Sequence, residues 1–129
     1  AGLHLLLAED NELNSEIATA LLEEQGASIT AVENGRLALE AIQNAAPRTY
    51  DAILMDVMMP EMNGLEATRC IRAFEGKGPG ESTPIIAMTA NVFADDVKAC
   101  LDAGMNSHVG KPLDMKVLIG EILKYTDAR

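Results

Sequence analysis

Five short apolar runs, each followed by a segment with helical periodicity, constrain the fold of this chain more than any other feature. The runs lie at residues 3–8, 27–32, 51–55, 84–88 and 107–110. Nearly continuous apolar runs are typical of strands that are covered on both faces of a parallel sheet. Strands that alternate with helices predict one parallel sheet between two layers of helices, and 129 residues are enough for one such domain.

Capping residues predict the ends of the first helix. Asn11 is suited to begin a helix in which Leu13, Ile17 and Leu21 recur at every fourth position, and Gly26 is suited to end it. The other helices are predicted in the same way. Their apolar positions are Ala38, Ala41, Ile42 and Ala45; Leu65, Thr68 and Ile71; Val97, Cys100, Leu101 and Met105, with Gly104 as the stop; and Met115, Leu118, Ile122 and Tyr125 after a cap at Asp114.

Polar residues that could bind a ligand or take part in a reaction follow four of the five predicted strands. They are Glu9 and Asp10, Asp56, Thr89, and Lys111. The carboxyl ends of parallel strands meet at one edge of the sheet, which is where ligands bind in open α/β folds. We therefore expect all five side chains at one edge. Alone, Asp56 could simply cap a turn before Pro60 and Gly64.

Three carboxylates at one edge repel one another unless positive charge lies among them. Lys111 supplies one charge, and a divalent cation would supply the rest. Oxygen ligands without His or Cys favour a hard ion such as Mg²⁺. The competing interpretation is an incidental acidic rim with a structural Lys–Asp pair. The convergence of five residues favours the metal site.

Net charge and hydropathy exclude some partners. Ten basic residues against 20 acidic ones give a formal charge of −10, so nucleic acid is not expected to bind. The apolar runs have the length of strands and not of membrane spans, so we expect no membrane contact by this domain. The two cysteines, Cys70 and Cys100, lie far apart and outside any C-x-x-C pattern, which fits a reducing compartment, and we expect a cytoplasmic location.

The polar strand ends occur within a wider sequence pattern. Glu-Asp follows the first strand, Asp-Val-Met-Met-Pro-Glu-Met-Asn-Gly begins at Asp56, Thr-Ala follows the fourth strand, and Lys-Pro follows the fifth. Over essentially the whole chain this pattern resembles the receiver domain of two-component response regulators. The resemblance implies a single receiver domain over residues 1–129. It also implies a flavodoxin-like, doubly wound α/β fold with a five-stranded parallel sheet of order 2-1-3-4-5 and five helices.

The resemblance also implies roles for the acidic residues. Asp56 would accept a phosphoryl group and would also be a ligand of Mg²⁺, and Asp10 would bind the ion directly. Glu9 would bind the ion mainly through water, and the backbone carbonyl of Met58 would be a further ligand. The chain departs from the commonest pattern at Glu9, where Asp is frequent, and we expect metal binding to survive that change.

Three further residues would respond to the phosphoryl group. Thr89 would hydrogen-bond its oxygens, and Lys111 would pair first with Asp56 and then with the phosphate. His108 stands where the family often has Tyr or Phe as a rotating switch. It is either such a switch or a surface histidine on a short edge strand, and the sequence does not separate the two interpretations.

The implied partner is a histidine kinase or a histidine phosphotransfer domain. Docking in the family uses the first helix and the segment after the fifth strand, here around Asn14, Ile17, Pro112 and Leu113. We expect a signalling phospho-acceptor and not a turnover enzyme on an external substrate. The chain would be a stand-alone receiver or a domain of a larger protein such as a hybrid sensor kinase, which its non-Met start favours and which could be anchored in a membrane.

Two other functions remain open at this point. A metal-dependent phosphohydrolase could pass through an aspartyl phosphate, although it usually has a second acid where this chain has Met58. A flavodoxin-like nucleotide carrier would need a phosphate loop rich in Ser and Thr where this chain has Glu9 and Asp10.

Overall fold

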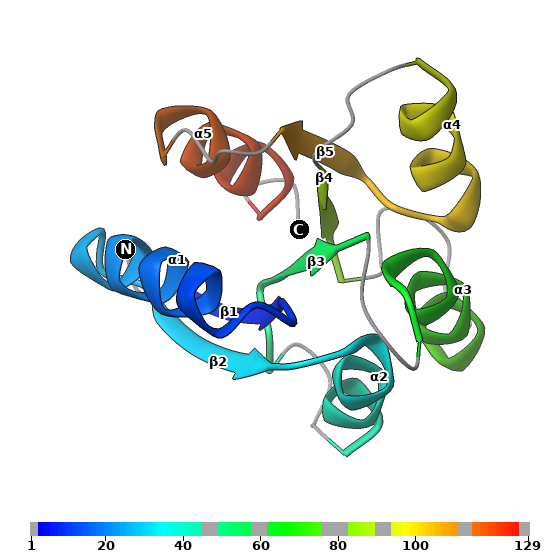
Figure 1. The fold of residues 1–129 in the computed structure, drawn as a ribbon, viewed down its shortest axis with the longest axis horizontal. Helices are drawn as coiled ribbons and strands as arrows, with labels where there is room; N and C mark the ends of the chain where they lie inside the picture. Colours follow the sequence, from blue (N-terminus) through cyan, green and yellow to red (C-terminus); the bar gives the residue numbers. More distant parts are fainter. Residues whose placement is uncertain are drawn as a thin grey trace.

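The computed structural model describes residues 3–44, 49–57, 62–75, 83–89, 94–110 and 115–126. Within these ranges strands and helices alternate along the chain as predicted (Figure 1). The elements are β1 His4–Ala8, α1 Glu12–Glu24, β2 Ser28–Val32, α2 Gly35–Asn44, β3 Ala52–Asp56, α3 Gly64–Glu75, β4 Ile85–Thr89, α4 Ala94–Ala103, β5 Ser107–Gly110 and α5 Met115–Thr126.

The strands form one parallel sheet of order β2-β1-β3-β4-β5, which confirms the fold implied by the family resemblance. β3 lies at its centre, between β1 and β4. Every residue of β3 and β4 is buried, whereas the edge strand β2 is only partly covered. The strand that ends in Asp56 is therefore among the best-fixed parts of the fold.

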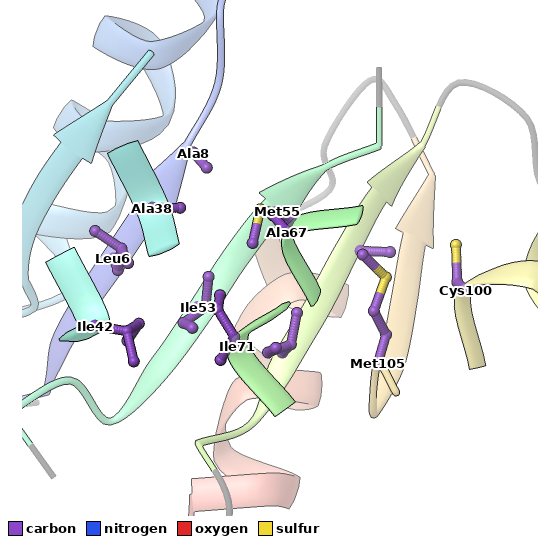
Figure 2. Close-up of a cluster of buried hydrophobic side chains, with 12 residues drawn as sticks. Leu6, Ala8, Ala38, Ile42, Ile53, Met55, Ala67, Ile71, Cys100 and Met105 are labelled. Atoms are coloured by element: carbon purple, nitrogen blue, oxygen red, sulfur yellow. The ribbon is translucent and has the colours of Figure 1, made fainter. Parts of the chain in front are cut away.

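Alternate residues of the strands build two separate cores, one on each face of the sheet. On one face Leu6, Ile53, Met55 and Ile85 pack with residues of α2, α3 and α4 (Figure 2). On the other face the second set packs against α1 and α5 and comprises Leu5, Leu7, Leu54, Ile86, Met88, Ala18, Leu22, Leu118 and Ile122, among others. Because side chains alternate across a strand, a strand buried on both faces must be apolar at nearly every position.

The predicted helix caps are confirmed where the structure describes them. Asn11 Oδ1 accepts a hydrogen bond of 2.9 Å from the backbone N–H of Asn14. Gly26 and Gly104 follow α1 and α4 with φ of 93° and 111°, the left-handed conformation that glycine adopts without strain. Asp114, the predicted cap of α5, lies outside the described residues.

The periodic apolar residues of α1 do not face the sheet. Leu13, Ile17 and Leu21 are 64%, 50% and 37% exposed, and α1 meets the sheet through Ala18 and Leu22. The helix itself was predicted correctly. Because Ala18 and Leu22 form the packing face, the apolar residues beside them form an exposed stripe.

The predicted apolar face of α4 was partly wrong. Cys100 is buried, but Leu101 is 49% exposed. Met105 lies after the helix, where its N–H donates to the carbonyl of Cys100 and its side chain joins the core. The chain reverses at Gly104, so Met105 reaches the core from outside the helix.

None of the helices in the described part of the chain is both long enough and apolar enough to cross a membrane.

Candidate phosphoacceptor and metal site

The carboxyl ends of β1, β3 and β4 meet at one edge of the sheet. Asp56 is the last residue of β3 and pairs with Met88 of β4, while its neighbour Met55 pairs with Ala8 of β1. Glu9 and Asp10 follow Ala8 directly. Strand pairing therefore fixes where these carboxylates meet, as we predicted from the order of the elements.

The three carboxylates do form a cluster. One oxygen from each of Glu9, Asp10 and Asp56 lies within 4.8 Å of those of the other two. Glu9 and Asp56 are 5% and 4% exposed, whereas Asp10 is exposed. The carboxylates of Glu9 and Asp56 are thus largely shielded from solvent, whereas that of Asp10 is accessible to it.

The donor set fits a hard divalent cation. All three groups offer oxygen, and Mg²⁺ binds oxygen at about 2.1 Å, so two ligands on opposite sides of the ion lie about 4.2 Å apart. Separations of up to 4.8 Å allow two carboxylates to bind directly and the third through water. Mg²⁺ commonly keeps several waters in this way.

Thr89 and His108 occupy different positions relative to this cluster. Thr89 is the buried last residue of β4, next to Met88, whose carbonyl accepts a hydrogen bond from Val57 N–H at 3.2 Å. It therefore ends its strand beside the end of β3. His108 is half-buried within β5, where it pairs with Ala87. Its role as a switch stays a prediction.

Several predicted residues lie outside the described part of the chain. These are Met58, Lys111, Pro112 and Leu113. Lys111 follows Gly110, the last residue of β5, and Gly110 pairs with Thr89. The predicted roles of Lys111 and of the Met58 carbonyl remain predictions.

His4 has no place in this cluster. Its ring lies 4.8 Å from that of Tyr50, centroid to centroid, and its Nε2 lies 2.9 Å from Thr30 Oγ1. Its backbone N–H donates to Asp51 Oδ2 at 2.8 Å. These contacts are at the amino end of the sheet, so His4 has a packing role there.

Two glycines allow close backbone approaches near the site. A Cβ at Gly64 would lie 2.4 Å from the carbonyl oxygen of Asp56, and a Cβ at Gly35 would lie 2.3 Å from that of Met62. Such distances leave no room for any side chain. The available signal was that a glycine stands at the start of each of the two helices α2 and α3.

Comparison with known proteins identifies the family. Residues 5–123 match the response regulator receiver domain family. Among curated proteins, the chain is 41% identical over 140 residues to probable histidine kinase 1 of Oryza sativa subsp. indica. The match covers 87% of this chain and 14% of that relative, so the chain spans a small part of the length of the protein it resembles.

Solved structures agree with this match. The receiver domain of a sensor histidine kinase from Pseudomonas aeruginosa PAO1, determined with a magnesium ion in its active-site cleft, superposes with a TM-score of 0.84 at 38% identity, covering 98% of this chain and 99% of that one. A second match, with a TM-score of 0.87 and 26% identity, comes from the complex of the Saccharomyces cerevisiae histidine phosphotransfer protein Ypd1 with the receiver domain of Ssk1. It covers 98% of this chain and 90% of the other. With the sheet order and the carboxylate cluster, these matches show that the chain belongs to the response regulator receiver domain family.

Proposed function

We propose that this domain accepts a phosphoryl group on Asp56, with Mg²⁺ bound by the adjacent carboxylates, as one step of a two-component phosphorelay. The observation that carries the proposal is the cluster of Glu9, Asp10 and Asp56, with Asp56 buried at the end of the central strand. The magnesium ion in the P. aeruginosa receiver supports the choice of metal. Family membership favours this function over the phosphohydrolase and the nucleotide carrier.

Each carboxylate has a distinct role in the proposal. Asp10 would hold the metal directly and Glu9 would hold it through water, while Asp56 and the carbonyl of Met58 would be the other protein ligands. A carboxylate oxygen of Asp56 attacks phosphorus as the P–N bond of phosphohistidine breaks, and the electron pair of that bond stays on the imidazole. Bound Mg²⁺ would stabilise the charge on the phosphoryl oxygens. No general base is needed, because an ionised Asp is already a nucleophile.

In the proposal, residues at the ends of neighbouring strands respond to phosphorylation. Thr89 donates its hydroxyl hydrogen bond to a phosphoryl oxygen, and Lys111 pairs with the phosphate. A phosphoryl group adds negative charge and three strong acceptor oxygens, which is enough to reorient both side chains. His108, on the strand that precedes Lys111, is the proposed switch residue.

We further propose that residues 1–129 act as one receiver domain that does not turn over an external substrate. Its location is proposed to be cytoplasmic. The formal charge of −10 supports a protein partner over nucleic acid.

Incubation with a small acyl phosphate and Mg²⁺ tests the central proposal. We expect intact mass to rise by one phosphoryl group, and the modification to be lost at alkaline pH as acyl phosphates are. A chelator should prevent the gain, because the phosphoryl oxygens would then lack their counter-charge. A modification that survives alkali, or that forms equally well with chelator, would contradict the proposal.

The exposed stripe of α1 is the proposed docking surface for a histidine phosphotransfer domain. Leu13, Ile17 and Leu21 lie on the helix that begins two residues after Asp10, and apolar patches next to a reactive site commonly bind a partner. The yeast complex of a receiver with a histidine phosphotransfer protein supports this kind of partner. Asn14 lies exposed on the same helix.

Replacing Ile17 by Ala should slow phosphoryl transfer from a phosphorylated histidine phosphotransfer domain by roughly tenfold at sub-saturating concentrations. Transfer from a small acyl phosphate should not change, because the carboxylate site is untouched. Stopped-flow or gel-based transfer assays measure both rates. Phe74→Ala is the matched control, since Phe74 is 52% exposed but lies on α3, on the opposite face of the sheet. Equal slowing by both variants would place docking elsewhere.

A further inference from the structure

The segment from the end of β2 to the start of α2 contacts the backbone of Glu9 and the connection that follows Asp56. At one end, the carbonyl of Val32 accepts a hydrogen bond of 3.1 Å from the backbone N–H of Glu9. At the other end, the N–H of Gly35 donates to the carbonyl of Met62 at 3.0 Å. Met62 belongs to the connection between Asp56 and α3. Residues 32–35 therefore link the backbone of a metal-site residue on β1 with the connection that follows the acceptor on β3.

The contact at Gly35 leaves no room for a side chain. A Cβ there would lie 2.3 Å from the carbonyl oxygen of Met62, 2.9 Å from Ala67 Cβ and 3.0 Å from the carbonyl oxygen of Asn63. Gly35 is buried and is the first residue of α2. Glycine in a helix costs about 1 kcal/mol relative to alanine, so the close approach gives a physical reason for glycine at this position.

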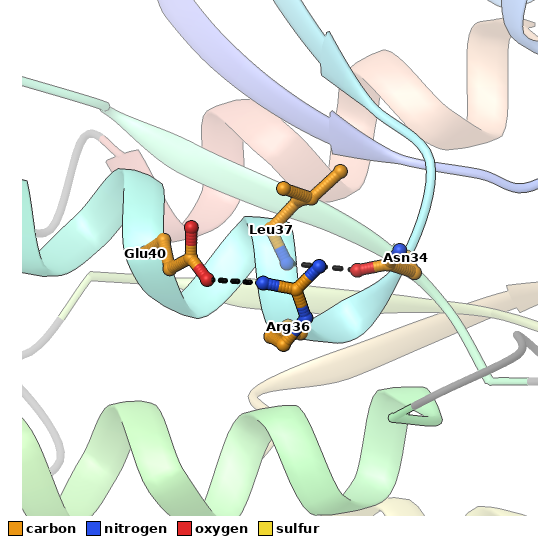
Figure 3. Close-up of polar contacts among 4 residues, drawn as sticks. All are labelled: Asn34, Arg36, Leu37 and Glu40. Carbon is orange, nitrogen blue, oxygen red and sulfur yellow. Dashed lines mark hydrogen bonds and ion pairs between the residues drawn. The ribbon is translucent and has the colours of Figure 1, made fainter.

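Asn34 fixes the position at which α2 begins. It is 8% exposed, and its Oδ1 accepts a hydrogen bond of 2.8 Å from the N–H of Leu37 (Figure 3). A side-chain cap of this kind satisfies one of the free N–H groups of the first turn. The first turn of α2, and Gly35 with it, is thereby held in place against Met62.

A displacement of Met62 would also displace the backbone of Asp56, because few residues separate the two contacts. The N–H of Gly64 donates to the carbonyl of Val57 at 3.0 Å, and a Cβ at Gly64 would lie 2.4 Å from the carbonyl oxygen of Asp56. The residues from Met62 to Gly64 therefore lie between Gly35 on one side and the backbone of Asp56 on the other. On both sides the backbones approach too closely for a side chain to fit between them.

We propose that Asn34 and Gly35 are positioning residues for the carboxylate site: the start of α2 holds the connection after Asp56 at the distance from β1 that metal binding requires. The proposal rests on the proposed function of Glu9, Asp10 and Asp56. Neither residue touches the metal or the phosphoryl group. Both act through the backbone of Met62.

The test is the Mg²⁺ affinity of Gly35→Ala, measured by NMR titration of the backbone amides of Val57 and Met62. We expect affinity to fall about tenfold or more, as it does when residues that orient metal ligands are changed. The two amide signals should also shift in the metal-free protein. The rate of phosphorylation by a small acyl phosphate should fall with the affinity.

Two other glycines separate positioning from general destabilisation. Gly104→Ala is also strained, because Gly104 has φ of 111° and its Cβ would lie 2.8 Å from Arg72 Cγ, but it precedes the amino end of β5. It should lower the urea midpoint and leave the Mg²⁺ affinity of the folded protein unchanged. Gly120→Ala places its Cβ in open space and should change neither quantity adversely.

Asn34 keeps the proposal testable if Gly35→Ala does not fold. Asn34→Ala should weaken Mg²⁺ binding by freeing the first turn of α2, and Asn34→Ser, which restores a cap, should recover most of it. Folded Gly35→Ala or Asn34→Ala protein with wild-type Mg²⁺ affinity would overturn the proposal, as would an equal loss of affinity in Gly104→Ala. Wild-type protein that neither binds Mg²⁺ nor takes up a phosphoryl group would instead overturn the proposed function, and this inference with it.

Discussion

Asp56→Asn should abolish phosphoryl uptake while leaving the fold intact. The amide has nearly the shape of the carboxylate but no negative charge, so it is a far poorer nucleophile. Asp56 is 4% exposed at the end of the central strand, where an isosteric change disturbs little packing. Intact mass after incubation with a small acyl phosphate and Mg²⁺ should show no added phosphoryl group, and the circular dichroism spectrum should match that of the wild type.

Asp51→Asn is the matched control, because Asp51 immediately precedes the same strand at its amino end. Its Oδ2 accepts the backbone N–H of His4 at 2.8 Å, and an Asn side chain can keep that hydrogen bond. Phosphoryl uptake should equal that of the wild type. Phosphoryl uptake by Asp10→Asn should lie between that of Asp56→Asn and that of Asp51→Asn, and excess Mg²⁺ should restore part of it. Uptake by Asp56→Asn at the wild-type level would mean that another residue is the acceptor.

The convergence of Glu9, Asp10 and Asp56 could be predicted because it needs only the direction of the strands and their alternation with helices. Strand limits were less well determined. β3 ends at Asp56 and β4 at Thr89, one residue beyond the predicted apolar runs. Backbone pairing can continue through a polar residue at the end of a strand. A pattern of apolar residues therefore does not predict the last paired residue.

The exposed stripe of α1 shows a limit of periodicity. Leu13, Ile17 and Leu21 satisfy the helical spacing as well as any buried face would. Spacing reveals that an apolar face exists, but not whether the sheet or another protein covers it. Here Ala18 and Leu22 lie against the sheet, and Leu13, Ile17 and Leu21 remain exposed. The close contacts of Gly35 and Gly64 were also missed as contacts, because they join segments that are distant in sequence.

Arg72 was not singled out from the sequence, since a charged residue on a helix is usually solvated. In the structure it is half-buried, and its guanidinium donates hydrogen bonds to Gly104, Thr83 and Asn106. Its Nε donates to the carbonyl of Gly104 at 2.9 Å, its Nη1 to that of Thr83 at 2.8 Å, and its Nη2 to Asn106 Oδ1 at 2.8 Å. The same Asn106 oxygen accepts the N–H of Ile85, so the guanidinium joins α3 to the starts of β4 and β5.

Arg72→Ala should therefore lower the free energy of unfolding by about 3 kcal/mol, because it leaves several partly buried acceptors without their charged donor. Urea unfolding measures this. Arg36→Ala is the matched control. Arg36 pairs with Glu40 on α2 (Figure 3), at 2.6 Å and with side chains 51% and 44% exposed. Exposed pairs of this kind contribute about 0.5 kcal/mol. Arg72→Lys should recover little, since one ammonium group cannot reach three acceptors that a planar guanidinium bonds together. Losses of similar size for Arg72→Ala and Arg36→Ala would show that the three hydrogen bonds only replace bonds to water. A large difference would show that burial and geometry, and not charge, decide which arginine stabilises this fold.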